Sequence, residues 1–155
     1  MPDIVGHAIA MLDTPTRVVV VQFPHWSSFA AALGRSARSA FEPIVRAVVA
    51  HAPLVEVTTP GVIVFATRGP SRYVGGDQPL AALIHSSVAS AVGEMLGAGS
   101  DAAHATDAAH AIDTAHAAFG VGIADGRLAA GIASHHALRD RKSTRLNSSH
   151  LVISY

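Results

Sequence analysis

The sequence contains no cysteine and has few charged or aromatic residues, and each shortage excludes a class of protein. Without cysteine, neither disulfides nor thiolate metal sites can form. Charged residues make up 14% of the chain and the formal net charge is zero, so charge alone gives no argument for a nucleic-acid partner. No apolar run approaches the roughly 20 residues that span a bilayer, and the basic start of a secretory signal is missing. We therefore expect a cytoplasmic protein with no membrane partner.

Lysine and asparagine are missing from most of the chain, and this shortage sets the tail apart. The only Lys, Lys142, and the only Asn, Asn147, lie within residues 140–155. That segment resembles the translation of a sequencing-adapter oligonucleotide, so we exclude it from fold reasoning; an ordinary polar extension is the alternative. The whole chain has eleven basic and eleven acidic residues, of which three basic and one acidic lie in this segment. Residues 1–139 therefore keep eight basic and ten acidic groups, a net charge of −2.

Apolar residues make up 50% of this 155-residue chain, enough for one domain with a hydrophobic core. Residues 1–16 show no sustained period and form a lead-in. Short runs rich in β-branched and aromatic residues predict four strands. These strands are 17–23, 54–58, 62–65 and 119–124. Because 62–65 is apolar throughout, it predicts a central strand that is buried on both faces.

Apolar residues at helical spacing predict four helices. These helices are 27–33, 39–52, 77–97 and 127–137. Ser39 and Glu42 fit a capping box with Pro43 in the first turn, and Asp77 is a predicted N-cap. The glycine-rich stretch 67–76 predicts a turn after the central strand. The order of elements predicts an α+β fold of the ferredoxin-like βαββαβ type, with both long helices on one face of an antiparallel sheet.

Residues 101–118 interrupt this pattern with three copies of a six-residue unit, DAAHAT-DAAHAI-DTAHAA. The copies place three histidines and three aspartates in step. They are His104, His110, His116, Asp101, Asp107 and Asp113. Both residue types are metal ligands, so one interpretation is a metal-binding segment. On a helix, however, six residues turn through about 600°, which leaves successive histidines about 120° apart. We favour a slipped-repeat insertion, and expect no metal site and no cofactor.

Three stretches together resemble the palm domain of Y-family (UmuC-like) DNA polymerases. VGIADGRLAAGIAS, residues 121–134, is similar without a gap to the family's strand-to-helix motif VGIA-x-N-K-x-L-A-K-x-A-S. Residues 41–76 resemble the palm segment that ends in a glycine-rich loop with Arg and an aromatic residue. Residues 18–32 lie where the family's first carboxylate motif is expected. The resemblance covers 17–139 apart from the repeat, and implies a palm-like domain.

The resemblance also implies acidic residues that hold two Mg²⁺ ions and activate the primer hydroxyl. At the matching positions this chain has Gln22 at the end of the first strand and Gly61-Val62 on the central hairpin. These residues cannot supply the anionic oxygen ligands that Mg²⁺ prefers. In the third motif, Gly126 and Gly131 replace an expected Asn and an expected Lys. We therefore expect no polymerase activity.

Loss of the acids from a retained scaffold resembles the ImuB-like, non-catalytic branch of this family. In that branch PDW commonly follows the first strand, and this chain has Pro24-His25-Trp26 there. The resemblance implies a protein of DNA repair and damage-induced (SOS) mutagenesis that joins DNA, the sliding clamp and an active polymerase in translesion synthesis. Where the family has its fingers subdomain, this chain has only residues 34–40. The family's thumb and little-finger subdomains have no counterpart in the sequence. We therefore expect weak DNA binding, and clamp and polymerase contacts through regions missing here.

Three arginines are the candidate DNA contacts of this chain. Arg68 and Arg72 lie in the central turn, and Arg127 begins the last helix. All three can meet phosphates, or can be solvated or ion-paired surface residues. Trp26 can stack on a base, but we interpret it as a core aromatic residue.

Other functions stay open. An active translesion polymerase would use other acids, for which Asp77 and Asp125 are the candidates. A small ferredoxin-like domain would instead bind a metal ion through 101–118. A non-functional reading-frame fragment is the remaining alternative.

Overall fold

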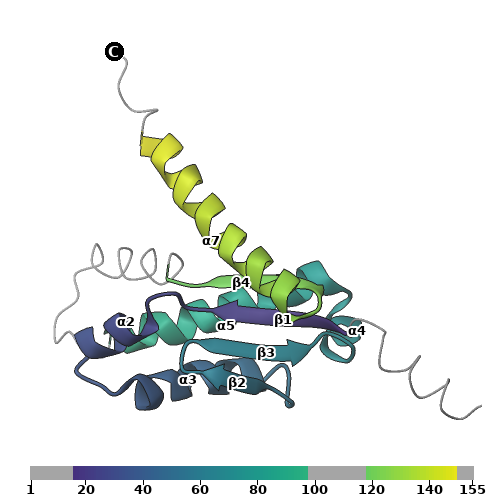
Figure 1. Cartoon of the computed structure of the whole chain (residues 1–155), viewed down its shortest axis with the longest axis horizontal. Helices are drawn as coiled ribbons and strands as arrows, with labels where there is room; N and C mark the ends of the chain where they lie inside the picture. The colour runs from purple at the N-terminus through teal and green to yellow at the C-terminus, as the bar shows by residue number, and fades with distance from the viewer. Residues whose placement is uncertain (1–15, 98–117, 150–155) are drawn as a thin grey trace, which may run out of the picture.

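Four strands form one antiparallel sheet in the computed structural model, which describes residues 16–97 and 118–149, with side chains to residue 140. The strands are β1 (Arg17–Gln22), β2 (Glu56–Thr59), β3 (Val62–Ala66) and β4 (Gly120–Asp125). Their order across the sheet is β2-β3-β1-β4 (Figure 1). Every neighbouring pair is antiparallel. The mixed α+β fold with an antiparallel sheet is confirmed, and each predicted strand lies within two residues of its expected bounds.

β1 is an inner strand of this sheet, paired along its length with β3 on one side and β4 on the other. Its four consecutive valines, Val18–Val21, are all buried. Successive side chains of a strand point to opposite faces, so four buried residues in a row require both faces to be covered. Ile63–Phe65 of β3 are buried in the same way. The prediction of a central strand buried on both faces is confirmed.

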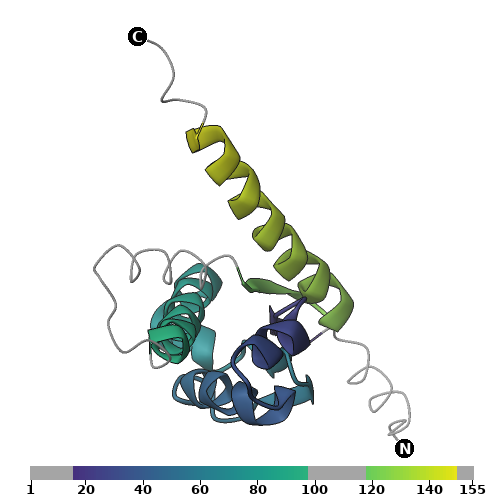
Figure 2. The same cartoon turned by 90° about the vertical axis from the view of Figure 1, so that its left-hand side faces the viewer.

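Two long helices, α3 (Ala37–Val49) and α5 (Asp77–Gly97), cover one face of the sheet, and the short helix α2 (Trp26–Ala32) lies beside α3 (Figures 1 and 2). Each long helix contributes apolar side chains three or four residues apart, which form a single stripe. The fully buried members of these stripes are Ile44, Val48, Leu80, Ile84, Val88 and Val92. They pack against Val19, Val21 and Ile63 of the sheet as the main core.

The helix α5 changes one expectation about membranes. With 21 residues and a mean hydropathy of 1.3, it is long and apolar enough to cross a bilayer. Its stripe from Leu80 to Val92 is nevertheless buried in the main core. A core helix of a globular domain passes the same test of length and composition, so α5 is weak evidence for a membrane segment.

The last helix, α7 (Arg127–Ser149), lies on the other face of the sheet, over β4 and β1 (Figure 2). Two glycines of β4 permit this close contact. A Cβ atom at Gly120 would lie 2.0 Å from the Ser134 carbonyl oxygen, and one at Gly122 would lie 2.2 Å from the Ser134 nitrogen. The predicted end of this helix at Ala137 is wrong, because the following Arg, Lys and Leu residues are good helix formers and the helix continues.

The capping box predicted at Ser39 and Glu42 is also wrong, because α3 begins two residues before Ser39. Ser36 is the cap, and its Oγ accepts a hydrogen bond of 3.2 Å from the Ser39 N–H. Pro43 therefore lies inside the helix, where it cannot donate to the Ser39 carbonyl. The Arg35 guanidinium donates to that carbonyl instead, at 2.8 Å. This replacement hydrogen bond explains why the helix tolerates the proline.

The predicted turn after β3 contains a short helix that the sequence analysis missed, α4 (Pro70–Val74). Pro70 starts it, since the fixed φ of proline suits the first helical position. Gly75, with a φ of +92°, ends it. Two other predicted segments, 101–117 of the repeat and 1–15 of the lead-in, lie outside the described residues.

Candidate functional site

The positions that the resemblance assigns to metal-binding acids lie together at one end of the sheet, which we call the Gln22 end. Gln22 is the last residue of β1, and its cross-strand partners are Val62 of β3 and Gly120 of β4. The Gln22 side chain is hydrogen-bonded to Ser134 Oγ of α7, at 3.2 Å. The sheet therefore brings positions 22 and 62 side by side, and both side chains there are uncharged.

Gly61, at the same end, has no room for a side chain. Its φ is +105°, a conformation that residues other than glycine rarely adopt. A Cβ atom there would lie 2.8 Å from Trp26 Cβ and 3.3 Å from the Phe23 carbonyl oxygen. The Gly61 carbonyl also accepts a hydrogen bond of 2.8 Å from the Phe23 N–H. Both the backbone and its packing therefore oppose a carboxylate at position 61.

Aromatic side chains fill the space next to these positions. Phe23 makes ring contacts with Trp26, Phe41 and Phe119, at centroid separations of 5.1, 5.9 and 5.0 Å. Trp26 is 2% exposed, and its Nε1 donates to the Ala37 carbonyl at 2.7 Å. The interpretation of Trp26 as a core residue is confirmed, and its indole is not available to stack on a base.

The Gln22 end does not fit the two Mg²⁺ ions that the family resemblance implies. Magnesium is held by carboxylate, phosphate and water oxygens in octahedral geometry. The candidates here are one amide, one valine and one glycine with no room for a side chain. Among the described residues, no group of three or more His, Asp or Glu side chains is arranged to hold a metal ion.

The alternative acids, Asp77 and Asp125, lie at the opposite end of β1, which we call the Arg17 end. The Arg17 guanidinium contacts both carboxylates through Nε to Asp77 and Nη1 to Asp125, the latter at 3.2 Å. Ser71 Oγ donates to Asp77 at 2.5 Å. This hydrogen bond and the Arg17 guanidinium lower the pKa of Asp77. β1 spans five residue steps, so the two ends are about 17 Å apart.

Of the three candidate DNA contacts, Arg127 is engaged in an ion pair. Its guanidinium holds both carboxylate oxygens of Glu56 on β2, with Nη1 to Oε1 at 2.7 Å. These hydrogen bonds lower the pKa of Glu56 and raise the pKa of Arg127. A bidentate pair of this kind competes with a phosphate for the same donors.

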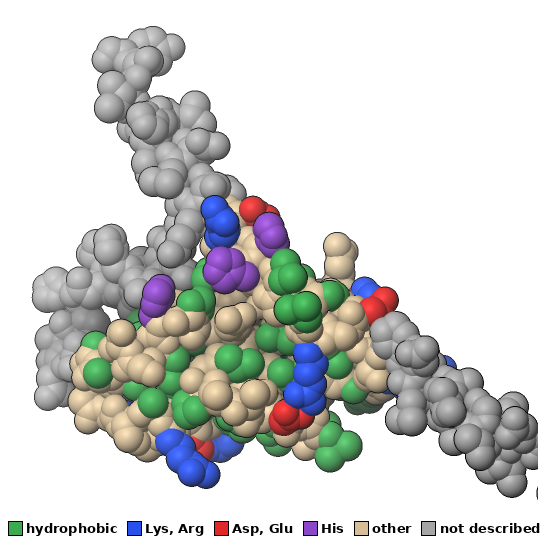
Figure 3. Space-filling view, in the orientation of Figure 1, with side chains coloured by type: hydrophobic (Ala, Val, Ile, Leu, Met, Phe, Trp, Pro, Cys, Tyr) green, Lys and Arg blue, Asp and Glu red, His purple; other side chains and the backbone are tan. Residues whose placement is uncertain are grey.

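Arg68 lies two residues before α4 and Arg72 lies within it, and both side chains are exposed. Within the described residues, no acid forms an ion pair with either of them. On the face shown in Figure 3, basic side chains are dispersed and several lie beside acidic ones, so they do not gather into one basic patch. The arrangement favours local contacts over a broad electrostatic surface.

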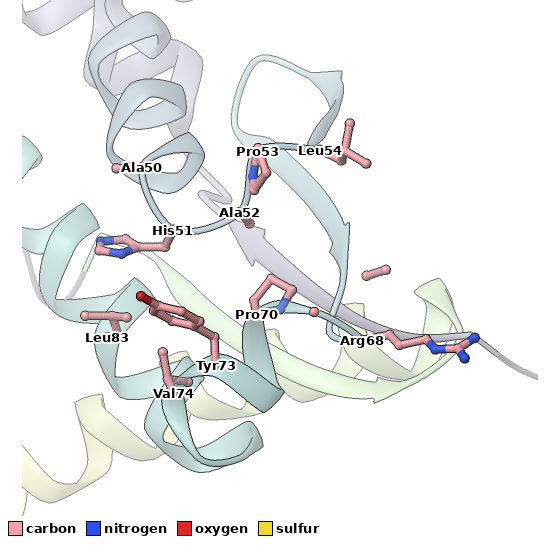
Figure 4. Close-up of a pocket in the computed structure, with 12 residues that line it drawn as sticks. Ala50, His51, Ala52, Pro53, Leu54, Arg68, Pro70, Tyr73, Val74 and Leu83 are labelled. Atoms are coloured by element: carbon pink, nitrogen blue, oxygen red, sulfur yellow. The ribbon is translucent and has the colours of Figure 1, made fainter.

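A groove of about 500 Å³ lies between the end of α3 and the start of α4. Its polar side chains are His51, Arg68 and Tyr73, and the rest of its lining is apolar, including Leu54 and Pro70 (Figure 4). The sequence alone predicts no role for His51 or Tyr73. The only signal was the aromatic residue in RGPSRYVGG, which the sequence alone does not place on a groove.

Comparison with protein-family models, with curated proteins and with solved structures finds no match to this chain.

Proposed function

We propose that this chain is a palm-like domain of a catalytically inactive Y-family DNA polymerase homologue of the ImuB-like type. It acts as a DNA-binding adaptor in DNA repair and damage-induced mutagenesis, in the cytoplasm. The strand order β2-β3-β1-β4 and the two long helices on one face support a ferredoxin-like palm, since split βαβ units produce this arrangement.

The main support for the proposal is that the residues at positions 22, 61 and 62, which form the Gln22 end, are all uncharged. Gln22 and Val62 are direct cross-strand partners, so acids at these positions would face one another across adjacent strands, as a metal site requires. Both are neutral, and at position 61 the φ of the glycine and its contact with Trp26 oppose an acid. A scaffold that keeps the geometry but fills the site with apolar packing is suited to binding and unsuited to nucleotidyl transfer.

The two acids that an active polymerase would have to use instead, Asp77 and Asp125, are already held in ion pairs. Asp77 and Asp125 share Arg17 in an ion-pair cluster that joins β1, β4 and the start of α5. One arginine between two carboxylates reduces their net charge from −2 to −1, which weakens the attraction for Mg²⁺.

The proposal is tested with the full chain, a fluorescent primer–template and Mg²⁺. We expect saturable DNA binding in fluorescence anisotropy and no extension of the primer on a gel. Extension that persists through successive purification steps would overturn the proposal, as would the absence of any binding to primer–template at low salt.

A further inference from the structure

The groove beside α4 exposes an aromatic ring that the fold does not use. Tyr73 is 93% exposed, although it belongs to a helix, α4, that packs on α5. In Figure 4 its ring stands over the groove, with the hydroxyl end toward His51 and Leu83. Leu54, which lines the same groove, is 87% exposed. Two large exposed apolar groups on one groove are typical of an interaction site.

The charge of the groove indicates what kind of partner it accepts. Among the described residues that line the groove, Arg68 is the only one of the Arg, Lys, Asp and Glu types. Arg72 is the sequence neighbour of Tyr73 on α4 and is also exposed. His51, by contrast, is held by Ser87, with Nε2 and Oγ 2.7 Å apart, so its ring is fixed as part of the wall. The groove thus has an exposed aromatic ring and, farther along its lining, an arginine that pairs with no acid of the described residues. This combination matches a ligand that carries both a flat ring and a negative charge.

We propose that this groove binds single-stranded DNA, with a base stacked on Tyr73 and a backbone phosphate at Arg68. Stacking on an aromatic side chain needs an unpaired base, because the faces of paired bases are covered within a duplex. An apolar peptide would use the groove without the arginine, and a duplex would use the arginine without the ring. Of these three ligands, the unpaired strand is the one that uses both the ring and the arginine. The inference rests on the proposed function, and adds to it the class of DNA and the residues that recognise it.

The test measures binding of fluorescein-labelled oligothymidylate to the full chain by anisotropy, with Tyr73→Leu, Tyr73→Phe and Arg68→Ala variants. Leu keeps an apolar side chain but removes the aromatic face, whereas Phe keeps the face. We expect Tyr73→Leu to weaken binding roughly ten-fold and Tyr73→Phe to leave it nearly unchanged. Arg68→Ala should weaken binding and reduce the slope of log affinity against log salt by about 0.7, the value for one phosphate contact on a single strand.

Arg38→Ala is the matched charge control. Arg38 is exposed in the first turn of α3, and the groove lies at the other end of that 13-residue helix, about 18 Å away. Its removal should leave the affinity and the salt slope unchanged. Circular dichroism of each variant checks that the fold is retained. We expect it to be retained, because the side chains of Arg38, Arg68 and Tyr73 are all exposed.

The outcomes separate this inference from the proposed function. DNA binding that is equally strong in Tyr73→Leu, or equally reduced by Arg38→Ala and Arg68→Ala, overturns the groove assignment and leaves the adaptor proposal standing. Tighter binding to a duplex of the same sequence than to the single strand also overturns the groove assignment. Absence of all DNA binding overturns both proposals, and primer extension by the wild-type chain overturns the proposed function alone.

Discussion

The two ends of β1 differ in what surrounds them. At the Arg17 end, one guanidinium is shared by Asp77 and Asp125, and glycine Gly126 has open space around it. At the Gln22 end, no acid is found at the positions that the resemblance assigns to metal ligands. Gly61 and Gly120 lie at this end, and neither has room for a Cβ atom. The same strand is therefore ionic and open at one end, and neutral and closely packed at the other.

This difference shows how the packing around one end of a strand can exclude charged side chains that the other end accommodates. An unpaired buried carboxylate is costly, so an acid is retained only where a cation, a metal ion or water accompanies it. Arg17 supplies that cation for the acids at its own end. At the Gln22 end, Gly61 and Trp26 instead close the space with apolar contacts. The packing at the Gln22 end thus opposes an acid at position 61.

The largest effect that separates the two ends is expected from glycine substitutions on β4. In Gly120→Ala, the new Cβ atom would meet the Ser134 carbonyl at 2.0 Å, so α7 must move off the sheet. We expect a loss of roughly 3 kcal/mol or more in unfolding free energy, measured by urea denaturation. At the Arg17 end, Gly126→Ala adds a Cβ atom with nothing within 4 Å, and only the φ of +85° opposes it. It should cost about 1–2 kcal/mol. Equal costs would contradict the account.

A smaller effect is expected at Gly61. Gly61→Ala combines a φ of +105° with a Cβ contact of 2.8 Å to Trp26, whereas Gly75→Ala has a φ of +92° and open space. The pair separates backbone strain from crowding. We expect Gly61→Ala to cost about 1–3 kcal/mol more than Gly75→Ala in urea denaturation. If the two variants are equally stable, the Gln22 end has room for a side chain and the packing argument fails.

The smallest effect concerns the charges of the Arg17 end. The pKa of Asp77 is lowered in the folded state by Ser71 and by Arg17. Its contribution to stability is therefore present above the unfolded-state pKa of about 4, and is lost as the pH falls through the folded-state pKa. In Asp77→Asn, the unfolding free energy should fall less steeply below about pH 4. If the unfolding free energy of Asp77→Asn falls as steeply below pH 4 as that of the wild type, the ion pair between Asp77 and Arg17 contributes nothing to stability.

Local sequence signals were sufficient for the strands and for the position of the core helices. β1 and β3 are runs of β-branched residues, and the stripe of α5 follows helical spacing, so each is specified by its own residues. The start of α3 was misplaced because Ser36 and Ser39 both have the side chain of an N-cap, and it is Ser36 whose Oγ accepts from a helix N–H. Two capping residues three positions apart give the same local signal, so the sequence pattern does not choose between them.

The candidate site was predictable in part. The motif spacing placed Gln22 and Val62 at matching strand ends, and the register makes them partners. The contact between Gly61 and Trp26 joins residues that are far apart in the sequence, so no local pattern reports it. The exposure of Tyr73 and the pairing of Arg127 with Glu56 likewise depend on how distant elements meet.

The central claim, that the Gln22 end holds no catalytic metal site, is tested most directly by binding of Mn²⁺, which can replace Mg²⁺ and is observed by electron paramagnetic resonance. The full chain is titrated beside Asp77→Asn and Gln22→Ala variants. The account predicts no saturable, stoichiometric site in any of the three proteins. A stoichiometric site that is lost in Gln22→Ala would contradict the claim at this end of the sheet. A site that is lost in Asp77→Asn would instead show that the acids of the Arg17 end hold the metal ion.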